Sequence, residues 1–499
     1  MDRFRKNPHI YEINLATWLH HLSKREKRKI TLRNIPEKEW ADLKKKGIDI
    51  IWLMGIWQRS LFSRRVAQKE QPLIEECRSV LQDFSTDDIA GSPYAVYDYV
   101  PDPEFGLAEA LIALKKRLEE RGLFLILDFV PNHTACDHPW INEYPHLYVH
   151  KRAQKRKQCP DGFFLTEGSR GKFCIAHGKD PYFPPWTDTA QVDYSNPGAI
   201  HAMVDLVSDI SRYCHGLRCD MAMLVVSSVF RTTWADHIDK GKSNEEELWP
   251  LAIERVGSCG RKFYWIAEVY WGMEQELLNL GFDYVYDKTF YDLLVSTDVR
   301  RLKAYLSAPV AQQEKMLRFL ENHDEQRAAS VFGLQKLQSA MVIHATLPGM
   351  KLWHHGQLEG NTIRVPVQLR RGPEETPVSE LKAFCNALLH EVNHPVFHDG
   401  RWQLCDTSGW PDNQSYINLL AWRWALGEEK RLIVVNFSST PAQGLVKVPQ
   451  DWFARSKELL CRDLIKGESY HLHPADVSNS GLYVALQDWD FHFFTIERR

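Results

Sequence analysis

The sequence has no long hydrophobic run and no marked excess of charge. Its longest mostly apolar runs, Ile50–Trp57 and Met221–Val226, are far shorter than the roughly 20 residues that a membrane-spanning helix needs. The first residues, MDRFRKNPHIYEI, lack the apolar core of a signal peptide, so we expect no secretory leader. A formal net charge of −3 argues against nucleic acid or an anionic membrane as the main partner.

The ten cysteines are scattered, and none forms a CxxC pair. This spacing argues against a cysteine zinc site or a dithiol motif. We therefore expect reduced, partly buried thiols and a cytoplasmic location. With 499 residues, 44% of them hydrophobic, the chain can bury a large core and is too long for one ordinary domain.

Short apolar runs alternate with helical patterns through the first three-quarters of the chain. The segment Leu107–Arg121, for example, repeats leucine on one helical face, and Gly122 follows at the C-cap. Eight such strand–helix repeats predict a parallel (β/α)8 barrel of the TIM type. The predicted strands are His9–Asn14, Ile48–Met54, Leu123–Val130, Gly216–Asp220, Tyr264–Glu268, Phe282–Asp287, Leu317–Asn322 and Gly349–His354.

Two segments depart from this alternation. Residues 134–195 are rich in proline, glycine and aromatic residues, and we expect them to form an irregular insertion over the barrel mouth after strand three. From about Pro395, short β-rich runs separated by turn residues predict a C-terminal antiparallel β-sandwich. The predicted domains are therefore a catalytic barrel (1–133 and 196–390), an inserted substrate-loop domain (134–195) and a sandwich (395–499).

Three acidic residues end or closely follow three predicted strands: Asp220, Glu268 and Asp324. The C-terminal ends of barrel strands converge on one mouth, so these carboxyl groups can meet. Glycoside cleavage with retention needs one carboxylate as nucleophile and one carboxylic acid about 5–5.5 Å away. Arg218 shares a strand face with Asp220, and we expect its guanidinium to keep that carboxylate ionised.

Each fragment has a structural reading beside the catalytic one. A strand-end acid beside an arginine is more often a structural ion pair than a nucleophile. Asp128 and His133, after the third predicted strand, could satisfy loop backbone groups or bind sugar hydroxyls. Histidines 133, 138, 354 and 355 with Asp137 invite a metal reading, but their spacing suits no single helical face.

Four motifs together resemble the signature regions of the α-amylase superfamily, glycoside hydrolase family 13. They are LDFVPNH, GLRCDMAML, WIAEV and ENHD, in the order and at the strand positions of that family. QVDYSNP and LPGMKLWHHGQLEG resemble two further family segments. The resemblance implies that Asp220 is the nucleophile, Glu268 the acid/base and Asp324 the transition-state stabiliser. It also implies that Arg218, His133 and His323 line the sugar subsite, that Asp128 supports its floor and that Tyr94 stacks on the sugar ring. A plain core or loop tyrosine is the alternative for Tyr94.

Departures from the family pattern bear on the substrate. After Asp220, endo-acting amylases carry a lysine and a histidine that serve a sugar subsite and a calcium site; here the stretch reads Met-Ala-Met-Leu. We therefore expect no required cofactor; a structural calcium ion remains an open alternative that the motif after Asp220 does not support. Ala95 stands where many exo-acting α-glucosidases have an aspartate that clamps the non-reducing end. Trp271, three residues past Glu268, is our candidate for an aromatic contact to sugar.

These observations predict a retaining α-glycosidase that acts on short α-linked glucosides through a covalent glucosyl-enzyme. Two alternatives remain: a transglycosidase or isomerase of the trehalose synthase or amylosucrase type, and a catalytically silent carbohydrate-binding or scaffold relative. The expected partner is an oligosaccharide or disaccharide, with no nucleic acid and no membrane. The sequence leaves the linkage, the acceptor and the oligomeric state open.

Overall fold

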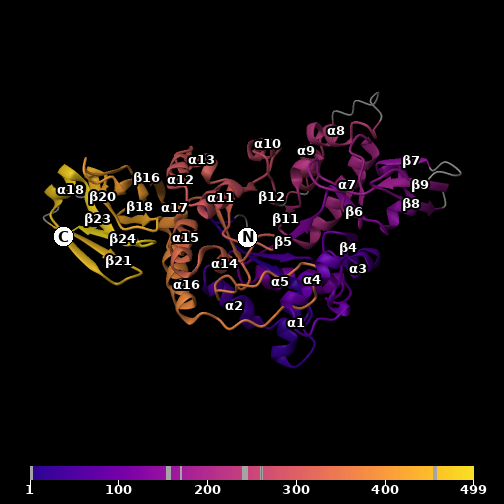
Figure 1. The fold of residues 1–499 in the computed structure, drawn as a ribbon, viewed down its shortest axis with the longest axis horizontal. Coiled ribbons are helices and arrows are strands. Elements are labelled where there is room, and N and C mark those ends of the chain that lie inside the picture. The colour runs from indigo at the N-terminus through magenta and orange to yellow at the C-terminus, as the bar shows by residue number, and fades with distance from the viewer. Residues whose placement is uncertain are drawn as a thin grey trace.

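The computed structural model shows a central barrel with a β-sandwich at one end and an inserted sheet at the other (Figure 1). It describes residues 4–152, 159–168, 171–238, 246–258, 260, 262–452 and 458–498. Eight parallel strands close the barrel, because β1 pairs with both β2 and β15. The strands are β1 (His9–Asn14), β2 (Ile50–Met54), β5 (Phe124–Phe129), β11 (Gly216–Cys219), β12 (Tyr264–Ala267), β13 (Tyr284–Tyr286), β14 (Met316–Arg318) and β15 (Met350–His354).

The eight-stranded barrel predicted from the sequence is confirmed, and its seventh strand is shorter than expected. The prediction covered Leu317–Asn322, whereas β14 ends at Arg318. Phe319 and Leu320 leave the hydrogen-bonded ladder but stay fully buried, so the apolar pattern runs beyond the strand. The residues that follow are then free to carry His323 and Asp324 away from the sheet.

Helices cover the outside of the barrel. In the helix α5 (Ala108–Glu119), the buried face consists of Leu111, Leu114 and Leu118, as the sequence pattern predicts. Leu107 was expected on that face, but it is the N-cap residue and is 68% exposed. Other helices include α1 (Leu15–Glu26), α2 (Glu37–Lys45), α7 (Pro197–Ile210), α8 (Ser227–Trp234), α9 (Leu248–Gly257), α11 (Lys288–Ser296), α12 (Val299–Leu306), α15 (Leu334–Thr346) and α16 (Ser379–Val392).

Two long connections lie between barrel strands at the mouth. The connection after β2 contains β3 (Trp57–Arg59), α3 (Leu61–Ala67), α4 (Gln71–Val80) and β4 (Val96–Pro101). The insertion after β5 contains β6 (His133–Ala135), α6 (Pro139–Glu143), β7 (His150–Arg152), β8 (Phe163–Gly168), β9 (Gly171–Ala176) and β10 (Thr189–Gln191). The insertion is thus present where it was expected, whereas the exact domain boundaries stay a prediction.

The C-terminal part consists of two antiparallel sheets around a separate apolar core. One sheet has the order β16-β18-β19-β24-β21-β22 and the other β17-β20-β23. Their bounds are β16 (Arg401–Leu404), β17 (Thr407–Ser408), β18 (Leu419–Leu426), β19 (Glu429–Asn436), β20 (Ala442–Val446), β21 (Leu459–Asp463), β22 (Ser469–Leu472), β23 (Leu482–Leu486) and β24 (Phe491–Arg498).

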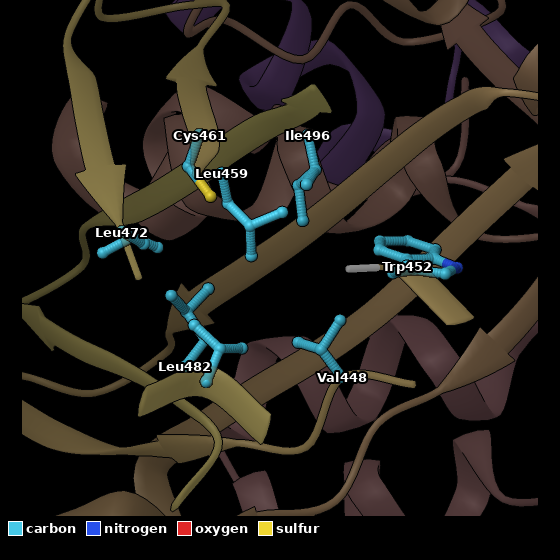
Figure 2. A pocket seen from close by; sticks show the side chains of 8 residues that line it. Val448, Trp452, Leu459, Cys461, Leu472, Leu482 and Ile496 are labelled. Carbon is cyan, nitrogen blue, oxygen red and sulfur yellow. The ribbon is translucent and has the colours of Figure 1, made fainter. Parts of the chain in front are cut away.

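A small apolar gap lies inside this sandwich core. Figure 2 shows side chains that include Trp452, Leu459, Leu482 and Ile496 around it. Its volume of about 10 Å³ is at the lower limit for a single water molecule, and its lining offers no exposed polar surface. The gap is therefore a packing feature of the sandwich.

The expectation that all thiols are reduced is wrong for one pair. Cys159 and Cys174 form a disulfide that ties the segment before β8 to β9. The two cysteines are far from a CxxC spacing, and only the antiparallel pairing of the insertion brings them together. Seven other cysteines are free and buried, and Cys259 lies outside the described residues. Across the described part of the chain, no helix is both long and apolar enough to cross a bilayer.

Candidate active site

Strand register brings the predicted acidic residues to one mouth of the barrel. Arg218 on β11 lies opposite Asp128 on β5, and Cys219 lies opposite Ala267 on β12. The next residues, Asp220 and Glu268, continue the ladder: the Asp220 amide donates to Phe129 O at 2.8 Å, and the Glu268 amide to Cys219 O at 3.0 Å. Both carboxyl groups are therefore carried on backbone fixed by the barrel.

Arg218 joins the two predicted catalytic residues. Its Nη1 donates to Asp220 Oδ1 at 2.7 Å, and its Nη2 lies 2.9 Å from Glu268 Oε2. The same Nη1 is 3.8 Å from Asp128 Oδ1. One buried guanidinium thus stands among three buried carboxyl groups, which explains how so many acids can lie together in a site of low exposure.

Aromatic rings surround this guanidinium. Its carbon lies 5.2 Å from the ring centre of Trp52, and 5.5 Å from those of Tyr94 and Tyr286. The Tyr286 hydroxyl also accepts a hydrogen bond from Arg218 Nε at 3.2 Å. These contacts fix the orientation of Arg218 and favour its positive charge.

Glu268 is held by a precise set of donors. The backbone amide of Met221 donates to Oε2 at 2.7 Å, and the Tyr270 hydroxyl donates to Oε1 at 2.9 Å. Met221 has φ 41° and ψ 47°, a left-handed conformation that is rare for a bulky residue and occurs at strained functional turns. The turn after Asp220 therefore aims an amide directly at the predicted acid/base.

Burial raises the pKa of both predicted catalytic groups. Burial raises the pKa of Glu268 to about 7; Arg218 opposes the shift, and the nearby charges of Asp220 and Asp324 add to it. Burial also raises the pKa of Asp220, against the charge and hydrogen bond of Arg218. A carboxylic acid whose pKa lies near neutrality suits a general acid.

A second network runs from the barrel interior to Asp324. Glu12 on β1 is fully buried, and its Oε1 lies 2.5 Å from His323 Nδ1. His323 Nε2 is 3.1 Å from Asp324 Oδ2 and 2.7 Å from the Tyr94 hydroxyl. Burial lowers the pKa of His323, but Asp324 and Glu12 outweigh it and raise that pKa well above 6.5. His323 is therefore a charged donor between two carboxylates.

Asp324 is the most accessible of the acidic residues, with 51% of its side chain exposed. The surrounding protein raises its pKa, but the charge and hydrogen bond of His323 outweigh this and lower the pKa to about 2. An ionised, half-exposed carboxylate held by a histidinium can accept hydrogen bonds from hydroxyl groups of a ligand.

The remaining predicted residues occupy two different places. Asp128 lies at the floor, where Gly55 N donates to its Oδ2 at 3.3 Å, and burial raises its pKa to about 6. His133 packs against the Trp186 ring at 5.2 Å, and burial lowers its pKa to about 4. No hydrogen bond in the described part of the chain joins His133 to the acidic residues, so its place in the sugar subsite stays a prediction.

Trp271 stands apart from the buried cluster, at the rim. It is 42% exposed, has φ 64°, and is followed by Gly272 at φ 75°. Its ring meets that of Tyr182, which is 70% exposed, at 5.0 Å and 77°. Asp180 Oδ1 accepts hydrogen bonds from the amides of Tyr182 and Phe183, at 2.6 and 2.9 Å. These bonds shape the insertion loop that presents the Tyr182 ring to Trp271.

Sequence reasoning missed Glu12, Tyr270 and Tyr286. Glu12 leaves one signal in the sequence, an acidic residue in the middle of the otherwise apolar strand HIYEIN. Tyr270 follows Glu268 by two residues, but nothing in the sequence shows that its hydroxyl turns back. Among the described residues, no group of three or more His, Cys, Asp or Glu is arranged to hold a metal ion.

Comparison with known proteins decides the family. The family model described as alpha amylase, catalytic domain, matches residues 41–420. This chain belongs to the alpha-amylase family. The fold fits that membership: it has the barrel, the C-terminal antiparallel sheets and buried carboxyl groups at the barrel mouth. Homologues in the family are glycoside hydrolases or transglycosidases that act on α-glucosidic bonds.

Individual relatives differ in what they are named for. Alpha-amylase 3 from Dictyoglomus thermophilum is 24% identical over 56% of both chains, and Trehalose synthase/amylase TreS from Mycobacterium tuberculosis is 29% identical over 24% of this chain and 20% of its own. The amino acid transporter heavy chain SLC3A1 of Mus musculus is 41% identical, but only over 13% of this chain and 8% of its own. The matched region thus covers at most 56% of the length of these curated relatives.

Solved structures show the same fold over the whole chain. The maltogenic alpha-amylase AmyB from Thermotoga neapolitana has a TM-score of 0.69, with 18% identity and 99% of each chain covered. The trehalose-6-phosphate hydrolase TreA from Bacillus licheniformis has a TM-score of 0.64, with 15% identity and 99% of each chain covered. At this identity the likeness concerns the fold alone.

Proposed function

We propose that this alpha-amylase family member is a retaining α-glycosidase that cleaves short α-linked glucosides by double displacement. The observation that carries the proposal is the single buried guanidinium of Arg218, in contact with both Asp220 and Glu268. Asp220 attacks the anomeric carbon, and Glu268 protonates the leaving oxygen. Glu268 then removes a proton from the acceptor hydroxyl or water, whose oxygen attacks the anomeric carbon and displaces the Asp220 carboxylate.

The other residues of the site receive roles from their contacts. Asp324, ionised and half exposed, grips hydroxyl groups of the reacting sugar, and His323 holds it in place. Tyr94 offers a ring beside His323, at 5.4 Å between centres, on which the sugar can stack. Arg218 supports the ionised nucleophile and Asp128 supports the floor. In this scheme Glu12 and Tyr270 are positioning residues, because they act through His323 and Glu268.

The test of the mechanism combines a variant with product stereochemistry. Asp220→Asn should abolish turnover and leave the fold intact, because an amide cannot attack the anomeric carbon. Retention of more than about a tenth of wild-type kcat, a loss below ~1.4 kcal/mol, would contradict the nucleophile assignment. Proton NMR of the wild-type reaction should show the α anomer first, since two inversions restore it; immediate release of the β anomer would refute double displacement.

Transfer to a sugar acceptor in place of water is the second candidate. The exposed rings of Trp271 and Tyr182 favour it, because Trp271 stands on the loop of the proposed acid and Tyr182, from the insertion, packs against it, where a leaving group or acceptor would lie. The local similarity to a trehalose synthase points the same way. Incubation of maltose, isomaltose, trehalose or sucrose with and without added glucose decides: new disaccharides indicate transfer, and glucose release alone indicates hydrolysis.

A catalytically silent relative is the third reading, and the same panel tests it. A silent protein would bind sugars without turnover, and Asp220→Asn would change nothing.

The cytoplasmic location inferred from the sequence also stays a prediction. It rested partly on reduced thiols, and the Cys159–Cys174 disulfide removes that support for one pair. Fractionation of the source cells would test the location.

A further inference from the structure

A group of four buried bases lies between the barrel and the C-terminal sandwich. It consists of His9 on β1, Lys351 on β15, His344 on α15 and His398 on α17 (Val396–Asp399), each at most 3% exposed. His9 and Lys351 are neighbours in the strand register, and the rings of His9 and His398 lie 6.1 Å apart. Figure 1 shows α15 and α17 between the barrel and the sandwich, so the bases belong to the junction of these two parts.

Hydrogen bonds hold two of these imidazoles in the neutral form. Trp353 Nε1 donates to His9 Nδ1 at 3.0 Å, so a proton on that nitrogen would face the indole N–H. His344 Nε2 donates to the Arg318 carbonyl at 3.0 Å, and within the described part of the chain its buried Nδ1 has no hydrogen-bond partner. A second proton on either ring would therefore be a buried donor without an acceptor, which is costly.

The third imidazole, that of His398, is arranged in a similar way. Its Nδ1 donates to the Lys6 carbonyl at 2.9 Å, and its buried Nε2 has no hydrogen-bond partner among the described residues. Burial lowers the pKa of His398 to about 3; the charge of Arg5 adds to the shift, and the carbonyls of Lys6 and Val392 oppose it only in part. Burial likewise lowers the pKa of His344 to about 3. Both rings are therefore neutral at physiological pH.

The charges around these bases oppose protonation. Lys351 is 1% exposed, and within the described part of the chain no carboxylate forms an ion pair with it. Asp49, the carboxylate that acts on Lys351, is bound by Arg5 Nε at 2.8 Å. Burial lowers the pKa of His9 well below 6.5, and the charges of Lys351 and Arg5 add to the shift. A proton taken up by this group would therefore meet positive charge in a buried place.

The helices that carry two of the bases also hold the sandwich. Phe397 on α17 packs against Trp424 of β18, with ring centres 5.8 Å apart. Trp422 and Trp424 donate from their indole nitrogens to Thr346, the last residue of α15, at 3.2 and 2.7 Å. Asn7, just before β1, donates to the Phe397 carbonyl at 2.9 Å. A displacement of α15 and α17 from the barrel would therefore free β18 as well.

We propose that this group of four bases is an acid-sensitive latch, which holds the sandwich on the barrel while the imidazoles are neutral and opens as they take up protons. In the closed state the three histidines bind no second proton. In the open state they are solvated, and their pKa returns to about 6.5. The stabilisation is therefore complete above about pH 6.5 and is lost as the pH falls below it. The latch is independent of the proposed glycosidase function.

The experiment measures amide hydrogen exchange of the purified full chain at pH 7.5 and 5.0, corrected for the intrinsic pH dependence of exchange. For each histidine that becomes solvated on opening, this fall in pH should raise the opening constant about 30-fold. Protection of the amides in α17 and β18 should therefore fall at least about 30-fold more than protection in β12, which lies opposite β1 in the barrel. An equal fall in β12, or no fall in α17 and β18, would overturn the latch.

Two variants assign the effect to the histidines. His398→Asn keeps a donor for the Lys6 carbonyl, and His344→Gln keeps one for the Arg318 carbonyl, but neither amide takes up a proton. Each variant should reduce the acid-induced loss of protection in α17 and β18 by about tenfold or more. His390→Asn is the matched control, because His390 is an exposed histidine on α16 at the same side of the barrel, and it should leave the loss unchanged.

The outcomes separate a titrating latch from a general loss of stability. The quantity compared is the change between the two pH values, so a variant that is less stable at both still reports on the latch. A full acid-induced loss in both His398→Asn and His344→Gln, or an equal reduction in His390→Asn, would contradict the assignment. Should the two variants misfold, the wild-type comparison of β18 with β12 still decides, because it needs no substitution.

Discussion

Replacement of Glu268 by Gln is the sharpest probe of the site, because the structure accommodates the amide. The Gln oxygen can take the place of Oε2 and accept from Met221 N, now 2.7 Å away. The amide nitrogen then faces the Tyr270 hydroxyl, which can turn from donor to acceptor. Arg218 keeps Asp220 as its partner. We expect the variant to fold as the wild type does and to lose only the transferable proton.

The size of the loss should depend on the leaving group. General acid catalysis contributes roughly 10²–10⁴-fold, which corresponds to about 2.7–5.5 kcal/mol of barrier. An alkyl α-glucoside needs that proton, so its rate should fall by this factor. The leaving group of a nitrophenyl glucoside is a stable nitrophenolate, which needs little protonation. Formation of the glucosyl-enzyme from this substrate, followed as the burst of released nitrophenol, should therefore slow less than about tenfold.

The pH dependence gives an independent sign. The pKa of Glu268 lies at about 7, and only its protonated form is an acid, so wild-type kcat/KM on alkyl glucosides should fall as pH rises through about 7. In Glu268→Gln this alkaline limb should vanish. Equal losses on nitrophenyl and alkyl glucosides, or an unchanged alkaline limb in the variant, would remove Glu268 from the acid role.

Three further predictions concern the fold and the substrate. Asp287→Asn leaves the fully buried Arg318 guanidinium, whose Nε is now 3.0 Å from Asp287 Oδ2, without its carboxylate partner. The free energy of unfolding should fall by about 3–5 kcal/mol, seen as a lower urea midpoint, and an unchanged midpoint would contradict this prediction. Ala95→Asp should shift preference toward short maltooligosaccharides held at the non-reducing end, and unchanged relative kcat/KM along a ladder of lengths would show that the sequence match at this position is wrong. Peptide mapping without reductant should recover Cys159 and Cys174 in one linked pair, and separate free peptides would refute the disulfide.

The features of the barrel that follow from local sequence were predictable. Each strand is a short apolar run, and the end of a parallel strand in a closed barrel can point only to one mouth. The meeting of Asp220, Glu268 and Asp324 in one electrostatic cluster follows from that rule. The lengths of strands were less predictable, as β14 shows, because burial of Phe319 continues beyond the hydrogen bonds that define the strand.

Contacts between distant segments could not be predicted. The pairing of Glu12 with His323 joins residues 311 positions apart across the barrel interior, and no local pattern encodes it. The link between Cys159 and Cys174 depends on a hairpin in the insertion, where the sequence has no clear periodicity. Long-range pairs of this kind depend on the exact path of loops, which side-chain periodicity does not constrain.

The proposed site has a polar side around Asp324 and an aromatic side near Glu268. In the proposed function, the polar side selects the sugar that is transferred and the aromatic side selects the acceptor. On the Asp324 side, charged groups from α4 and the stretch after β15 surround a cavity, so the surface offered to a ligand there is polar. On the Glu268 side, Trp271 and Tyr182 present exposed rings from two loops, so recognition there is apolar and tolerant of different partners. We propose that such a site would fix the sugar that is transferred more strictly than the group that receives it. In that proposal the exposed rings of Trp271 and Tyr182 decide whether water or a sugar takes the glucosyl group.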